Sequence, residues 1–244
     1  MWTSALRAEL IKLHRAPIWI VFIVLPLIAA AIGTFNYQGN LEILQNGWSD
    51  LWTQHTLFEG MFFLHALIGA VCSWLMKLEH QGTNWNQLMA SPAGALRVLA
   101  SKLFVGWLML GVALAATGAL FVASGKLIGL PGMPESEFAR WLLLAWVGGI
   151  AAVACQLLVS LLIRNFAAPV GIAVAGGLVG FYLYAYDSGL ACPYALVVMG
   201  LNSNGIEALT INQSAPFFVA AAAFTLAALG IASWLLASRD VRTG

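Results

Sequence analysis

Long apolar runs alternate along the chain with short polar segments. Six of the runs reach the length of about 20 helical residues that crosses a bilayer. Prolines stand near the start of three of them, where a helix tolerates the missing N–H: Pro17, Pro169 and Pro216. The predicted spans are 17–36, 57–76, 102–124, 140–163, 168–186 and 215–237. The pattern predicts an all-α integral membrane protein with a single transmembrane domain, residues 1–244.

Composition supports this class. Hydrophobic residues make up 61% of the chain and charged residues 9%, whereas soluble domains contain about 25% charged residues. A water-soluble domain of this size could not cover so much apolar surface. The net charge of +1 and the lack of a basic run give no site for nucleic acid. Three cysteines without a C-x-x-C motif predict neither a disulfide framework nor a zinc site.

The distribution of basic residues predicts the orientation. If the N-terminus is cytoplasmic, the outer segments hold only Lys126 and Arg140. The inner segments then hold Arg7, Lys12, Arg15, Lys77, Arg97, Lys102, Arg164, Arg239 and Arg242. Because basic residues concentrate on the cytoplasmic side of membrane proteins, we expect both termini in the cytoplasm.

Residues 1–16 form an amphipathic pattern before the first span. On a helix, one face carries the apolar side chains of Trp2, Leu6, Leu10 and Leu13. The basic side chains lie elsewhere, while Glu9 falls near the apolar face and interrupts the pattern. The periodicity predicts an interfacial helix lying at the inner membrane surface. The alternative is a basic tail that only sets the topology.

The connection between the second and third spans has internal structure, and its central part is the segment 78–96. Thr83 can cap a short helix whose apolar edge includes Trp85 and Leu88. Ser91-Pro92 then starts a second helix that runs toward the third span. This arrangement fits either a contact for a cytoplasmic partner or a surface loop whose Trp85 lies among lipid headgroups.

Six residues of this segment form the pattern E-x-x-G-T-x-W-x-x-L-x-x-x-P: Glu79, Gly82, Thr83, Trp85, Leu88 and Pro92. The pattern, placed between a second and a third span, resembles the membrane subunits of type-2 ABC exporters, in particular the permeases of lantibiotic and bacitracin immunity transporters. The N-terminal ELIKLHRAPIW and the Cys192-Pro193-Tyr194 sequence after the fifth span resemble the same group.

The resemblance implies an assembly. Two permease subunits, identical or related, would each be served by a cytoplasmic ABC ATPase subunit. The six pattern residues would form a coupling helix against the ATPase, and residues 1–16 would form an elbow helix. The chain has no G-x-x-x-x-G-K-[ST] motif, so we expect no enzyme activity and no cofactor in it, with ATP and Mg²⁺ on the partner. The expected location is the bacterial cytoplasmic membrane.

The resemblance also places the second and fifth spans along the substrate path. Their aromatic residues would offer an uncharged wall for an amphipathic or lipid-like cargo, although each could instead face lipid: Phe58, Phe62, Phe63, Phe181, Tyr182 and Tyr184. The segment 187–214 is predicted to be re-entrant, with Pro193 and Tyr194 capping the outer end of the path. Glycines of the fifth span, including Gly176 and Gly180, predict close helix packing either within one subunit or between two.

Outer loop 37–56 contains Trp48 and Trp52, which we expect at the headgroup level. Glu59 is expected at the outer end of the second span, and His65 about two turns deeper. His55, Glu59 and His65 would make a conceivable metal site, but no further ligands are evident, and no metal is expected.

Three other functional classes remain open. One is a non-catalytic membrane scaffold, which would not require the capped helix between the second and third spans. A secondary transporter usually has ionisable residues near the membrane midplane, and these spans have almost none. An intramembrane enzyme would need a catalytic cluster. The sequence therefore favours a permease subunit of an ATP-driven exporter that expels an amphipathic antimicrobial peptide. A drug, lipid or ion is the alternative cargo, and an ion-gradient-driven secondary transporter is the alternative class.

Overall fold

The computed structural model describes residues 2–14, 16–77, 79–80, 94–203 and 211–238. Every regular element in these ranges is helical. The elements are α1 (Trp2–His14), α2 (Ile18–Gly39), α3 (Trp48–Phe58), the π-helix η1 (Glu59–Phe63), α4 (Leu64–Lys77), α6 (Ala95–Leu127), α7 (Glu137–Leu162), α8 (Ala167–Ala185), the 3₁₀-helix η2 (Gly189–Ala191), α9 (Ala195–Leu201) and α10 (Ile211–Ser238).

Six helical stretches are long and apolar enough to cross a membrane. They are α2, the continuous stretch α3–η1–α4, α6, α7, α8 and the part of α10 from Ser214 to Ser238. The prediction of an all-α membrane protein with six spans is confirmed.

The second spanning stretch begins earlier than the sequence suggested, at Trp48 rather than near residue 57. Trp52, expected at the headgroup level, is instead 1% exposed. Its ring packs against Phe121, and its indole N–H donates to the carbonyl of Leu201 at 2.9 Å. The expectation for Trp52 was wrong, because burial among aromatic rings and a backbone acceptor replace the headgroup contacts.

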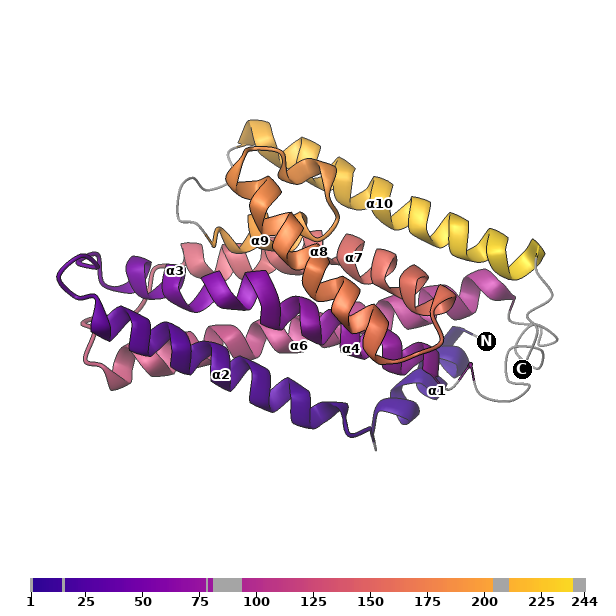
Figure 1. The fold of residues 1–244 in the computed structure, drawn as a ribbon, viewed down its shortest axis with the longest axis horizontal. Helices are drawn as coiled ribbons and strands as arrows, with labels where there is room; N and C mark the ends of the chain where they lie inside the picture. The colour runs from indigo at the N-terminus through magenta and orange to yellow at the C-terminus, as the bar shows by residue number, and fades with distance from the viewer. Residues whose placement is uncertain (1, 15, 78, 81–93, 204–210, 239–244) are drawn as a thin grey trace.

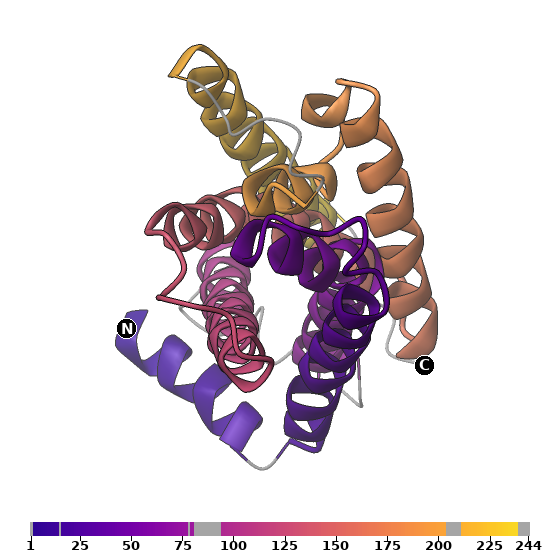
Figure 2. The same ribbon diagram turned by 90° about the vertical axis from the view of Figure 1, so that its left-hand side faces the viewer.

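The helices surround α4, which packs against α2, α6, α7 and α8 (Figure 1). At one end of the bundle lie α1, the end of α4 and the start of α6, and we call this the α1 end. The opposite end, called the far end, carries the α2–α3 and α6–α7 connections. Viewed from the far end in Figure 2, α8 and α10 diverge from the rest of the bundle.

A pair of tryptophans joins α6 to α7. The rings of Trp107 and Trp146 are stacked, with centroids 4.3 Å apart and planes 9° from parallel. Each indole donates a hydrogen bond to the other residue's carbonyl, at 2.7 Å from Trp107 and 2.9 Å from Trp146. Gly111 makes room, because a Cβ there would lie 2.9 Å from the Trp146 nitrogen.

The glycines of α8 allow close packing inside this chain. A Cβ at Gly176 would lie 2.6 Å from the Tyr194 ring, and one at Gly180 would lie 2.7 Å from the backbone nitrogen of Ala195. Both glycines of the G-x-x-x-G motif therefore face the segment that leads into α9. Of the two alternatives for this motif, the structure places it against its own chain.

Candidate functional site: a buried charge cluster at the α1 end

Five of the six residues of the coupling pattern lie outside the described residues: Gly82, Thr83, Trp85, Leu88 and Pro92. The sixth, Glu79, is 2% exposed and lies just beyond the end of α4. The prediction of a coupling helix therefore stays a prediction. The structure describes only Glu79, the first residue of the pattern.

Lys102, near the start of α6, lies in the interior of the protein with 0% exposure. Its ammonium group is 2.9 and 3.0 Å from the two carboxylate oxygens of Glu9, 2.6 Å from Oε1 of Glu79, and 2.7 Å from the carbonyl of Leu75. An ammonium has three N–H donors, and here three groups accept them. This charge is buried but fully paired.

Lys12 completes the cluster from α1. Its ammonium lies 2.9 Å from Oε1 of Glu9 and 2.5 Å from Oε1 of Glu79. Two carboxylates thus share two ammonium groups, and the formal charges cancel. We call Glu9, Lys12, Glu79 and Lys102 the α1 junction. It connects α1, Glu79 just beyond the end of α4, and the start of α6.

The pairing keeps Glu79 and Lys12 ionised. Burial alone would raise the pKa of Glu79, but the charge and hydrogen bond of Lys102, aided by Lys12, hold this pKa below its ordinary value of 4.5. Burial alone would lower the pKa of Lys12, yet Glu9 and Glu79 together raise it above 10.5. Both residues are therefore charged at neutral pH.

His80 adds a contact to a third helix. Its Nε2 lies 2.9 Å from the carbonyl of Ser160, near the end of α7. The chain is consequently attached to α1 and α6 through Glu79, and to α7 through His80, immediately before the segment that holds the pattern residues.

Only one indirect signal for the α1 junction is present in the sequence. Glu9 interrupted the apolar face of the N-terminal helix, and the structure explains why: its carboxylate is 4% exposed and points into the protein. On the predicted apolar face Leu13 is buried, but Leu10 is 42% exposed. Lys102 was separated from Glu9 by 93 residues, so no local pattern could pair them.

The predicted path residues come from three elements, α3, η1 and α8. Phe58, Phe62 and Phe63 lie on α3 and η1 and are half-buried, and η1 packs against α8. On α8, Phe181 and Tyr184 are half-buried, whereas Tyr182 is 59% exposed. The two elements η1 and α8, which each carry part of the predicted set, thus pack against each other, and Tyr182 is turned outward.

Tyr194 is buried in the bundle with the segment around it. Its carbonyl accepts a hydrogen bond from Nε2 of His65 at 3.1 Å, and its hydroxyl donates to Oε1 of Gln156 at 2.7 Å. The Gln156 amide in turn donates to the carbonyl of Pro169 at 2.6 Å. Pro193 is half-buried beside it. This network joins α4, α7 and α8 to the segment before α9.

The three residues considered for a metal site have separate partners. His55 lies 3.0 Å from the hydroxyl of Thr34, Glu59 lies 2.8 Å from the hydroxyl of Thr117, and His65 bonds Tyr194. Among the described residues no three His, Cys, Asp or Glu side chains come together in a way that could hold a metal.

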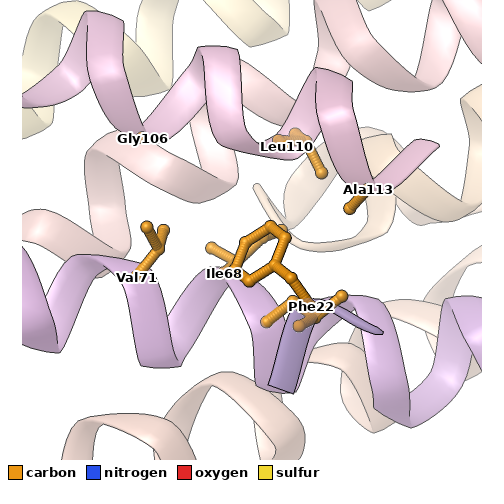
Figure 3. A pocket seen from close by; sticks show the side chains of 7 residues that line it. Phe22, Ile68, Val71, Gly106, Leu110 and Ala113 are labelled. Atoms are coloured by element: carbon orange, nitrogen blue, oxygen red, sulfur yellow. The ribbon is translucent and has the colours of Figure 1, made fainter. Parts of the chain in front are cut away.

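A narrow apolar cleft separates α2, α4 and α6 (Figure 3). Phe22 of α2 faces Ile68 and Val71 of α4, with Gly106 and Leu110 of α6 opposite. The cleft has no room for a water molecule. Its lining side chains are all apolar, so it offers no polar side chain to a ligand. We assign no binding function to it.

A helical bundle with six membrane-length segments and a buried charge cluster at one end defines a multi-pass membrane protein. The family model described as "ABC-2 family transporter protein" matches residues 5–180, more than half of the chain, and the protein belongs to this family. It is a permease subunit of an ABC exporter, and the family implies partnership with a cytoplasmic ABC ATPase. Neither a curated protein nor a solved structure matches the chain.

Proposed function

We propose that this permease expels an amphipathic antimicrobial peptide, and that the segment 78–96 receives movement from the ATPase. In this proposal the α1 end faces the cytoplasm, as the distribution of basic residues favours. Both termini are then cytoplasmic, in the cytoplasmic membrane of a bacterium.

The α1 junction is the observation that carries this proposal. Displacement of the coupling segment would act first on Glu79, which is bonded to Lys12 of α1 and Lys102 of α6. Because separating buried, paired charges is costly, α1 and the start of α6 would follow Glu79 rather than release it. A push at the segment would thereby reach three parts of the membrane domain together.

The cargo assignment rests on the aromatic residues of η1 and α8. Because η1 packs against α8, these residues would provide an apolar, ring-lined surface that suits a molecule with an amphipathic or lipid-like character. A drug, a lipid or an ion exported by the same machinery is the alternative cargo. The working assembly would contain a second permease, identical or related, and two ATPase subunits that hold the ATP and Mg²⁺.

The test separates ATP hydrolysis from transport. Trp85→Ala and Leu88→Asp should leave the protein inserted and ATP hydrolysis present, while ATP-driven peptide export from reconstituted vesicles is lost. Leu127→Asp, at an 87% exposed position at the far end, is the matched control and should retain export. Unchanged export in both segment variants would refute the coupling role. Export that follows an ion gradient and ignores ATP would favour a secondary transporter.

A further inference from the structure

Glu59 is an acidic residue inside a spanning segment. It lies eleven residues after Trp48, the start of its helical stretch, and it is 2% exposed. Its partner Thr117 lies ten residues before the end of α6, about 15 Å at 1.5 Å per residue. Within the described parts of the six spans, the other acidic residues, Asp50 and Glu137, lie at the first turn of their helices. Glu59 is therefore deeper in its span than the sequence suggested.

No cation partners Glu59 among the described residues, in contrast to the carboxylates of the α1 junction. The hydroxyl of Thr117 lies 2.8 Å from its Oε1 and also 3.1 Å from the carbonyl of Ala113. A hydroxyl has one proton to donate. If Glu59 is a neutral acid, it donates to Thr117 and Thr117 donates to Ala113, so both bonds are satisfied.

An ionised Glu59 would be far less well accommodated. Thr117 would have to leave Ala113 in order to donate, and a buried carboxylate would receive this one side-chain hydrogen bond from the residues that the structure describes. Ionised carboxylates are costly in an apolar interior unless they are paired. The hydrogen-bond arrangement thus matches the protonated acid, and an ionised Glu59 would require an added positive group.

Polar and aromatic groups lie on or beside the helical turn that begins at Glu59. Glu59 begins the π-helix η1, and single π turns occur often at functional sites. The hydroxyl of Ser203, 1% exposed, has no hydrogen-bond partner within the described part of the chain, and it would lie 3.0 Å from a Cβ at Gly60, the next residue of η1. The half-buried rings of Phe62 and Phe63 follow in the same turn. Aromatic faces attract organic cations.

We propose that Glu59 exchanges its proton for the cationic group of a cargo molecule. In the closed arrangement the acid holds the proton and bonds Thr117. When the site opens, the O–H bond breaks, the proton passes to water, and the carboxylate pairs with an ammonium, guanidinium or quaternary cation. This rests on the proposed function only in naming the cation as exported cargo, and it narrows that cargo to cationic molecules.

Other titratable groups lie on the elements around η1. His55 of α3 lies beside the Thr34 hydroxyl, and His65 of α4 bonds the Tyr194 carbonyl. Tyr37 of α2 and Tyr184 of α8 also lie on elements that pack against η1. Thr117 is the group of α6 that reaches Glu59. His55→Gln and His65→Gln are therefore the controls for a histidine origin of any pH effect.

The first experiment reads the proton directly, without ATP or a partner subunit. Infrared spectra of the purified protein in lipid discs at neutral pH should show the C=O band of a buried carboxylic acid. Glu59→Gln should remove it, and Glu137→Gln, at the exposed end of α7, should leave it unchanged. The glutamine amide can donate to Thr117 as the neutral acid does, so the variant retains the fold. A wild-type spectrum without the band overturns the proposal.

The second experiment uses tetraphenylphosphonium, a permanently charged cation that cannot itself release a proton. Its binding to the wild type should release one proton per cation and should tighten about tenfold for each pH unit while Glu59 is protonated in the free protein. His55→Gln and His65→Gln should keep this dependence, whereas Glu59→Gln should lose it together with the proton release. The proposal is overturned if Glu59→Gln binds the cation as tightly as the wild type does and with the same pH dependence. If exchange occurs but ATP-driven export does not, only the proposed function fails.

Discussion

Lys102 illustrates how a single residue can be both buried and charged. Its ammonium has no contact with solvent, yet every N–H has an acceptor. Removing one member of such a cluster leaves the others as uncompensated charges, which is more costly than losing the attraction itself.

Lys102→Met keeps much of the side-chain volume and removes the charge. It should lower the free energy of unfolding by about 3–5 kcal/mol, because Glu9 and Glu79 would then share only Lys12. Arg140→Met is the matched control: its pair with Glu137 is exposed, 48% and 38% for the two side chains, and should contribute less than about 1 kcal/mol. Denaturant unfolding in detergent measures both, and equal losses would contradict the role assigned to Lys102.

At the scale of elements, packing of α8 depends on residues without side chains. Gly180 lies against the backbone at Ala195, and Gly177 against the imidazole of His65. Gly171, on the same helix, has no atom within 4 Å of its Cβ position. The three glycines are alike in the sequence but not in their surroundings.

Gly180→Ala should destabilise the protein by about 1–3 kcal/mol, because a backbone nitrogen 2.7 Å away cannot move as a flexible side chain would. Gly171→Ala should be neutral or stabilise by about 0.5–1 kcal/mol, since alanine favours the helix and space is available. Thermal unfolding of the two variants measures the difference. The assignment of Gly180 to an internal contact fails if both variants behave alike.

The helices could be predicted from the sequence because hydropathy and length determine which runs can span a bilayer. Their contacts could not. Trp52 looked like a headgroup residue because its acceptor, the carbonyl of Leu201, is 149 residues away. The same holds for Glu9 and Lys102, whose pairing depends on how α1 lies against α6. The motif formed by Gly176 and Gly180 predicted a close helix contact, but the sequence did not show that the partner is the segment at Tyr194 and Ala195.

At the scale of the whole molecule, the α1 junction attaches α1 to the bundle. Because its members are charged, the strength of this attachment depends on pH. Glu79 has a pKa below its ordinary value when folded, so its contribution is present above 4.5 and is lost as the pH falls through the lower folded value. Lys12 has a raised pKa, so its contribution is present below 10.5 and is lost as the pH rises through the higher folded value.

We therefore expect α1 to stay attached between about pH 4.5 and 10.5 and to loosen outside this range. A spin label at Ile11→Cys, an exposed position of α1, should become more mobile at both extremes. A label at Leu127→Cys, at the far end, is the reference for general unfolding. Mobility that changes equally at both labels would mean that the α1 junction does not control the attachment.

The stacked indoles of Trp107 and Trp146 bear on where a cargo could leave. Parting α6 from α7 would break two reciprocal hydrogen bonds and a ring stack at once, so these helices should travel as one rigid body. The helices α8 and α10, in contrast, lie apart from each other in Figure 2. An exit path for cargo would then open beside the paired helices α6 and α7 and not between them.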